Sequence, residues 1–255
     1  MTPSIPWRDI KALSFDIYGT LIDWEKGLTQ AARNSALGPF LPADHKTLVV
    51  DITKYETAMQ QEFPTMKQSL AITHAIERYA AELQVVENGH LSAEELERAA
   101  QEIGSSIGRY PAFNDTIQAM ELLAKHYKVI VLSNVDHESF SQTLIGPLQN
   151  LPFDAVYIAE DIGTYKPNLN NFRYLVGHLK ENFGIEQDEL CHVANSLFHD
   201  QEPAKEFGLP YRVWVDRRGF AGGEAEGAEE RLGMQVRVET LGELAEIVEG
   251  AWREG

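Results

Sequence analysis

Residues 11–21 read KALSFDIYGTL, and this stretch decides the fold. Its first part, residues 11–16, is a short run of β-prone residues that ends in an acid, Asp16. Gly19 follows two residues after Ile17 and is a turn former. We therefore expect a strand whose carboxyl end presents Asp16 at a turn.

The chain that follows has two different patterns. From about residue 24 to 109, apolar residues recur at helical spacing, and Ser92-Ala-Glu-Glu95 has the form of a capping box. After residue 113, strands alternate with helices, and the strands are expected at residues 128–133, 153–160, 189–195, 211–216 and 235–239. This alternation predicts an α/β fold with a doubly wound, Rossmann-like parallel sheet. We predict a core of residues 1–22 plus 110–255, with a helical cap at 23–109 inserted after the first strand.

Polar residues stand where the predicted strands end. They are Asp16 after the first strand, Ser133 and Asn134 after the second, Lys166 at the entrance of the helix after the third, and Asn195, Ser196, His199 and Asp200 after the fourth. In open parallel sheets, ligands bind at the carboxyl ends of the strands. A single polar strand end is commonly structural, but four in this order predict a functional site.

The residue types at this edge indicate a reaction. Asp16 can act as a covalent nucleophile, and Lys166 can keep its carboxylate ionised, because a nearby opposite charge favours the charged form. Ser133 and Asn134 offer hydrogen-bond donors to an anionic group of the substrate or leaving group. Asp200 can orient Lys166 or help to activate a water molecule.

These residues resemble the haloacid dehalogenase superfamily. The motifs that carry the resemblance are FDIYGTL at residues 15–21, VIVLSN at 129–134, YKP at 165–167 and VANSLFHD at 193–200. The resemblance covers the whole chain, including the position of the helical cap. It implies a hydrolase in which Asp16 attacks the substrate and forms an aspartyl ester that water hydrolyses. By the same resemblance, Thr20, Ser133 and Lys166 hold the nucleophile and the substrate carboxylate, and Asn134 contacts the leaving halide.

Tyr18 makes the match closest to the L-2-haloacid dehalogenases. Phosphatases of the superfamily carry a second Asp at this position, which protonates the leaving alkoxide. A phenol, with a pKa near 10, does not substitute easily, and a departing halide needs no proton. We therefore predict carbon–halide chemistry without a metal or other cofactor. The residues predicted to be catalytic are Asp16, Lys166, Asp200 and Ser133, and those predicted to bind substrate are Tyr18, Thr20, Asn134, Asn195 and Ser196.

The sequence departs from the dehalogenase pattern at three places. The family has an arginine early in the cap, but no arginine lies between Arg33 and Arg78. A family tyrosine is replaced by Phe172, which we interpret as a less polar pocket. Asn195 and Ser196 stand further from Asp200 than in dehalogenases, a spacing similar to that of the phosphatases. From these departures we expect small 2-haloacids to be poor substrates.

The sequence leaves other functions open. One is a Mg²⁺-dependent phosphatase, in which Asp16, Asp200 and the backbone carbonyl of Tyr18 would hold the ion. Another is a catalytically weak binding protein that keeps the fold. His199 is either a base or a residue in a structural hydrogen bond.

Composition limits the setting and the partners. The chain has 255 residues and a formal net charge of −17, which disfavours nucleic acid and anionic membranes as partners. Its single cysteine, Cys191, excludes a disulfide framework within the chain, so we expect a reducing, cytoplasmic location. The expected partner is a small-molecule substrate, with a homodimer as an option.

Overall fold

The computed structural model describes residues 4–219 and 226–253, and its centre is a parallel sheet. The strands are β1 (Ala12–Phe15), β2 (Lys128–Ser133), β3 (Ala155–Ile158), β4 (Leu190–Ala194), β5 (Tyr211–Val215) and β6 (Val236–Val238). These six strands lie in the order β3-β2-β1-β4-β5-β6, and every neighbouring pair is parallel. The prediction of a doubly wound α/β fold is confirmed.

The order of the strands places the end of β1 at the centre of the sheet. From β1 the chain builds one half through β2 and β3, and the other half through β4, β5 and β6. Phe15 of β1 is in register with Val131 of β2 and Val193 of β4. The residues just after these strands therefore meet at the switch point, where open α/β sheets bind ligands.

Alternate residues of the strands pack on opposite faces of the sheet. Leu13 and Phe15 belong to the larger apolar cluster, which includes residues of α5 (Thr116–Leu123) and α11 (Leu241–Arg253). Ala12 belongs to a second cluster that includes residues of α8 (Asn170–Phe183). The near-continuous apolar runs in the strands are typical of parallel sheets that are covered on both faces.

The remaining helices of the strand-containing part are shorter. They are α6 (His137–Ile145), α7 (Ala159–Ile162), α9 (Glu202–Phe207), α10 (Ala228–Leu232) and the one-turn helices η3 (Gln187–Glu189) and η4 (Leu197–Gln201), of which η4 is a π-turn. The third strand is shorter than expected because α7 begins at Ala159. Likewise α8 begins at Asn170, three residues later than the proline that was expected to open it.

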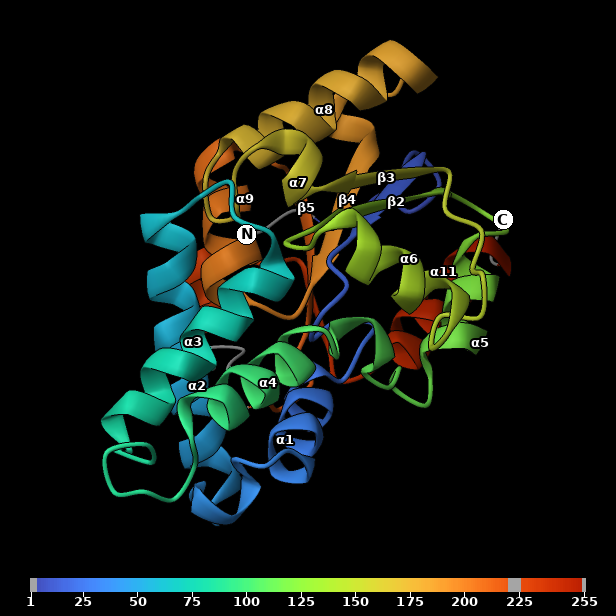
Figure 1. Ribbon diagram of the computed structural model, residues 1–255. Helices are drawn as coiled ribbons and strands as arrows, with labels where there is room; N and C mark the ends of the chain where they lie inside the picture. The colour runs from blue at the N-terminus through green and yellow to red at the C-terminus, as the bar shows by residue number, and fades with distance from the viewer. Residues whose placement is uncertain (1–3, 220–225, 254–255) are drawn as a thin grey trace.

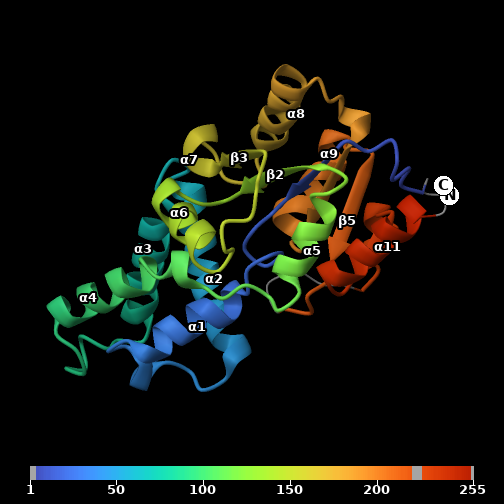
Figure 2. The ribbon, with the colours of Figure 1, turned by 90° about the vertical axis from the view of Figure 1, so that its right-hand side faces the viewer.

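Between β1 and α5 the described chain contains helices but no named strand. They are α1 (Trp24–Asn34), η1 (Gly38–Phe40), α2 (His45–Glu62), α3 (Gln68–Glu82), α4 (Ala93–Gly104) and η2 (Ile107–Arg109). The expected capping box at Ser92 and Glu95 opens α4. Figures 1 and 2 show α1 to α4 gathered at one end of the molecule, away from α8. We call these helices with η1 and η2 the cap; its limits at residues 23 and 109 stay a prediction.

The cap is tied to the rest of the molecule at several points. Ile22 and Ala112, on the segments that lead into and out of the cap, form an antiparallel bridge. At the start of α3, the amide of Ser69 donates to Asp136 Oδ2 over 3.0 Å, and the Tyr165 hydroxyl donates to the carbonyl of Met66. None of the helices in the described residues has the length and apolar character needed to cross a membrane.

Candidate active site

Asp16 follows β1 directly and is 5% exposed. Its Oδ1 accepts a hydrogen bond of 2.8 Å from Lys166 Nζ, and the Ser133 hydroxyl lies 3.5 Å from the same oxygen. Its Oδ2 accepts from the Thr20 hydroxyl at 3.2 Å. Gly19, at φ +99°, turns the chain so that Thr20 reaches back to the carboxylate. Two strand ends and one tight turn thus orient the predicted nucleophile.

Lys166 is buried, and all three of its N–H donors are used. Its Nζ donates to Asp16 Oδ1 at 2.8 Å, to Asp200 Oδ1 at 2.6 Å and to the carbonyl of Leu132 at 2.9 Å. The side chain of Asn134 brackets the lysine backbone, with Oδ1 accepting from Lys166 N at 2.7 Å and Nδ2 donating to Lys166 O at 3.0 Å. Asn134 therefore holds the lysine in place, while its predicted contact with the leaving group stays a prediction.

The oxygen of Asp200 that accepts from Lys166 is also contacted by a histidine. His192 Nε2 lies 3.0 Å from Asp200 Oδ1, and His192 Nδ1 lies 2.8 Å from the Ser14 hydroxyl. Ser14 and His192 are paired in register across β1 and β4, and both are fully buried. Sequence reasoning missed this pair, although a histidine and a serine inside two apolar strands were the available signal.

The three charged groups of this cluster, Asp16, Lys166 and Asp200, have shifted pKa values. Burial lowers the pKa of Lys166, but Asp16 and Asp200 raise it more, so the ammonium stays protonated. Burial raises the pKa of Asp200, but Lys166 and His192 lower it more, to about 2. Burial and the neighbouring Asp200 raise the pKa of Asp16 above its ordinary value against the opposing effect of Lys166. One ammonium therefore serves two carboxylates.

The fourth motif forms the next part of the wall. The amide of Asn195 donates to Thr20 Oγ1 at 3.0 Å, and its side-chain Nδ2 donates to Val215 O at 2.8 Å. Ser196 begins the π-turn η4, and its hydroxyl accepts from His199 N at 3.0 Å. Burial lowers the pKa of His199 to about 4, so the imidazole is neutral at neutral pH.

Tyr18 does not supply an acid to Asp16. Its hydroxyl lies 2.8 Å from Thr143 Oγ1, and that hydroxyl in turn donates to the Ser139 carbonyl. Burial raises the pKa of the Tyr18 phenol further. The ring lines the cavity, whereas the hydroxyl is bound to α6.

Phe172 corrects an expectation. The sequence led us to interpret this residue as a less polar wall of the pocket. Phe172 is instead fully buried between α8 and the sheet, where its ring packs edge-to-face on His192 at 5.3 Å between centroids. It is absent from the residues that line the described cavity, because this face of α8 covers the sheet below the strand ends.

A cavity of about 110 Å³ lies between the strand ends and the cap. The strand ends and their loops contribute Asp16, Tyr18, Ser133, Asn134, Lys166, Asn195, Ser196, His199 and Asp200. The cap and its connections contribute Trp24, Thr53, Glu56, Thr57, Gln60, Gln68, Ile72, Ile107 and Tyr110. Eight of the nine predicted site residues line it; Thr20 contacts Asp16 from behind. The cap residues were not predicted.

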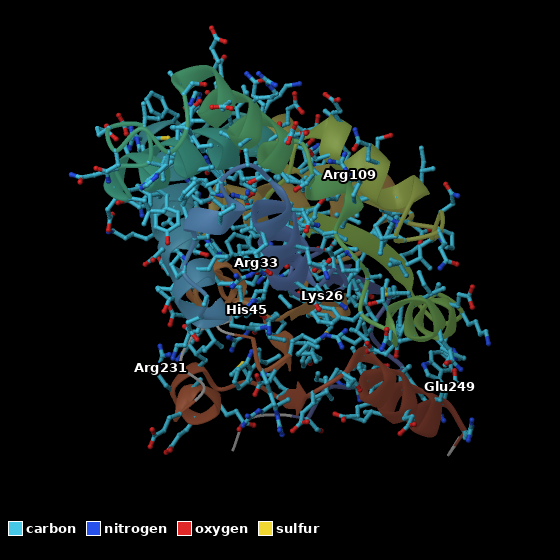
Figure 3. The ribbon with its side chains drawn as sticks, turned by 60° about the horizontal axis from the view of Figure 1, so that its bottom comes forward. Lys26, Arg33, His45, Arg109, Arg231 and Glu249 are labelled. Carbon is cyan, nitrogen blue, oxygen red and sulfur yellow. The ribbon has the colours of Figure 1, made fainter. Side chains whose placement is uncertain are left out.

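The basic residues of the cap do not reach this cavity in the described structure. Lys54 lies 3.7 Å from Glu82, and Lys67 lies 3.5 Å from Glu160. Arg33 donates to the carbonyls of Pro42 and Ala43, and Figure 3 shows it near His45 on the face formed by α1 and the beginning of α2. Among the described lining residues, the basic side chains are Lys166 and His199.

The carboxylates around Asp16 are already paired with a cationic side chain. Within residues 4–219 and 226–253, no group of three or more His, Cys, Asp or Glu side chains is placed to hold one. Asp16 and Asp200 share Lys166, and the Asn195 amide donates to a carbonyl. An Mg²⁺ ion prefers several oxygen ligands in octahedral geometry.

Comparison with solved structures supports the fold. The L-2-haloacid dehalogenase PA0810 superposes with a TM-score of 0.74 at 20% identity, covering 94% of this chain and 99% of that one. The L-2-haloacid dehalogenase from Xanthobacter autotrophicus gives a TM-score of 0.70 at 20% identity, over 94% and 99% of the chains. The putative HAD-hydrolase YfnB from Bacillus subtilis, bound to magnesium, gives 0.68 at 14% identity, also over 94% and 99%. No curated protein sequence matches this chain.

The sheet, the inserted helices and the carboxylate–lysine cluster define a hydrolase built on a doubly wound parallel sheet. The sequence pattern of the haloacid dehalogenase-like hydrolases matches residues 10–208. The chain belongs to this family, and the resemblance inferred from the four motifs is confirmed.

Proposed function

We propose that this hydrolase cleaves a carbon–halogen bond through a covalent ester on Asp16. The observation that carries the proposal is the position of the Tyr18 hydroxyl. Its hydroxyl is bound to Thr143, so this position offers no acid to protonate a leaving alkoxide. A halide leaves as a stable anion and needs no such proton.

The geometry around Asp16 supports the first step. In that step, one carboxylate oxygen of Asp16 forms a bond to the substrate carbon while the carbon–halogen bond breaks and its electron pair leaves with the halide. Lys166 and Thr20 each hold one oxygen of the carboxylate, which fixes its direction. Such orientation lowers the entropic part of the barrier.

The second step needs a base that takes a proton from water. We assign this role to His199, which lines the cavity and is neutral at neutral pH. Water adds to the ester carbonyl as His199 takes its proton. The bond between that carbonyl and the product oxygen then breaks, the proton passes from His199 to that oxygen, and the acid formed on Asp16 loses its proton to solvent, which restores the carboxylate. Asp200, bound by both Lys166 and His192, orients the lysine in this scheme.

The comparisons give partial support. In one structure of the Xanthobacter autotrophicus dehalogenase, at 20% identity and a TM-score of 0.68, chloropropionic acid is covalently bound. That adduct belongs to the other protein. For this chain, the arrangement of Asp16, Lys166 and Thr20 is the supporting evidence.

Chloride release and isotope incorporation test the proposal. The enzyme is incubated in ¹⁸O-water with excess protein over L-2-chloropropionate or L-2-chloropropionamide. We expect chloride release and ¹⁸O in the Asp16 carboxylate, found by peptide mass spectrometry. Label that enters only the product would mean that water attacks the substrate directly. Phosphate release from simple phosphate esters, without chloride release, would favour the phosphatase instead.

A further inference from the structure

Helix α2 presents a polar face to the cavity. Thr53, Glu56, Thr57 and Gln60 are spaced so that they share one side of the helix, and all four line the cavity. Gln68, at the start of α3, stands beside them. This set, which we call the cap wall, contains one acid and no base.

Glu56 is held in place by two amides. Gln60 Nε2 donates to Glu56 Oε1 at 3.2 Å, and Gln68 Nε2 donates to the same oxygen. Gln60 also donates to Gln68 Oε1 at 3.0 Å, which joins the two amides. In the part of the chain that the structure describes, no residue donates to Glu56 Oε2. One carboxylate oxygen is thus fixed, and the other is free to accept a hydrogen bond.

The charge of the cavity reinforces this arrangement. Lys166 is already shared by Asp16 and Asp200. Burial raises the pKa of Glu56 to about 7, although the Gln68 hydrogen bond opposes the shift. Above that pH the cavity holds three carboxylates and one ammonium. A carboxylate substrate would therefore meet a repulsive wall, and no arginine lines the described cavity to offset it.

We propose that Glu56 selects a substrate that carries an N–H donor, neutral or cationic, in place of the carboxylate of a 2-haloacid. This inference rests on the proposed attack by Asp16 and adds the class of substrate. The donor binds Glu56 Oε2 while the carbon that bears the leaving group faces Asp16. A hydrogen bond to an ionised acceptor is stronger than one between neutral groups. The ionised carboxylate of Glu56 therefore strengthens the preference for a substrate with an N–H donor.

The test compares two substrates with the same carbon skeleton. L-2-chloropropionate carries a carboxylate where L-2-chloropropionamide carries a neutral amide with two N–H donors. Chloride release is measured at about pH 8.5, well above the pKa of Glu56 of about 7. We expect a higher kcat/KM for the amide with the unaltered protein.

The variant Glu56→Gln removes the charge but keeps the size and an acceptor oxygen. We expect it to lower kcat/KM for the amide and raise it for the carboxylate, so that their ratio falls roughly tenfold. Glu62→Gln is the matched control, because Glu62 also lies on α2 but pairs with Arg78 outside the cavity. A preference for the carboxylate, or a ratio equally affected by both variants, would overturn the proposal.

A binding measurement separates this inference from the proposed reaction. In the Asp16→Asn background, which removes the nucleophile, calorimetry compares lactamide with lactate, the expected products. Tighter binding of lactamide, reduced by Glu56→Gln and not by Glu62→Gln, supports selection by Glu56 even if no chloride is released from either substrate. Equal binding, tighter binding of lactate, or no binding of either would overturn it.

Discussion

The two walls of the cavity differ in how they are built. The core wall consists of Asp16, Ser133, Lys166 and Asp200, which stand at strand ends or in the segments that follow them. The cap wall consists of side chains from one face of α2 and the start of α3. The core wall is a closed ion-pair network with both signs of charge, whereas the cap wall is a carboxylate held by two amides.

This difference assigns different tasks to the two walls. A network whose donors are all used is rigid, which suits a nucleophile that must keep one direction. A wall with a free acceptor suits the recognition of a substrate. We therefore expect changes in the core wall to lower kcat for every substrate, and changes in the cap wall to alter the choice between substrates.

Asp16→Asn should have the largest effect of all. It replaces the nucleophile with a neutral amide of the same shape, and we expect turnover to fall roughly 10⁴-fold or more. Circular dichroism should be unchanged, since the Thr20 hydrogen bond can persist. Asp51→Asn is the control: Asp51 lies on α2 outside the cavity, where it accepts from Tyr79 at 3.0 Å. Substantial activity in Asp16→Asn would mean that Asp16 is not the nucleophile, and that the core wall does not have the catalytic task assigned to it.

Lys166→Met should come next. It leaves two buried carboxylates without their shared ammonium, so the pKa values of both should rise and Asp16 should lose its charge. We expect kcat to fall roughly 10²–10³-fold and the free energy of unfolding to fall by about 3–5 kcal/mol. Kinetics and urea unfolding measure the two effects. A normal kcat for every substrate would mean that Lys166 is only structural.

The sequence was sufficient for the core wall because topology alone brings strand ends together. Asp16 and Lys166 are 150 positions apart, yet any parallel sheet with this strand order places them near one edge. The cap wall depends on how α2 is rotated and docked, which the helical period does not specify. Glu56 was therefore not predicted as a site residue. Phe172 was placed in the pocket, although it is buried between α8 and the sheet. His192 was missed because its contact with Ser14 depends on the register of β1 and β4, and its contact with Asp200 depends on how η4 folds back beside β4.

His192→Phe tests the missed part of the core wall. The substitution keeps an aromatic ring beside Phe172 but removes the donor to Asp200. The pKa of Asp200 should rise from about 2, and Lys166 should be held less firmly. We expect kcat to fall about tenfold and stability to fall by about 1–3 kcal/mol, because the Ser14 hydroxyl also loses its partner. Ser14→Ala is the control, and it should change stability more than kcat. An acid limb of the kcat profile at the same pH as in the unaltered protein would argue against positioning through Asp200.

The pH profile sharpens the comparison further. The pKa of Asp16 is raised by burial, and only its ionised form attacks. Activity should therefore be full above this raised pKa and fall tenfold per pH unit below it, with the limb lying above the ordinary aspartate value near 4. The profile should be measured with the Glu56→Gln variant, because this substitution removes the cap-wall acid whose pKa is about 7. A fall in activity that begins only below pH 4 would show that Lys166 lowers the pKa of Asp16 more than burial raises it.

A chelator should have the smallest effect, namely none on kcat with either substrate. A divalent ion at the core wall would have to compete with Lys166, whose ammonium already lies 2.8 Å from Asp16 and 2.6 Å from Asp200. Tyr18 and Asn195 stand at the two positions where, by the family resemblance, phosphatases have carboxylates, and each replaces a carboxylate with an uncharged group, whereas Mg²⁺ prefers charged oxygen ligands. The control is the protein after chelation and addition of Mg²⁺, which should be equally active. Loss of turnover on chelation and its return with Mg²⁺ would mean that the ion displaces Lys166 from one carboxylate. The core wall would then be an ion site rather than a closed pair network, and the phosphatase hypothesis would replace the proposed one.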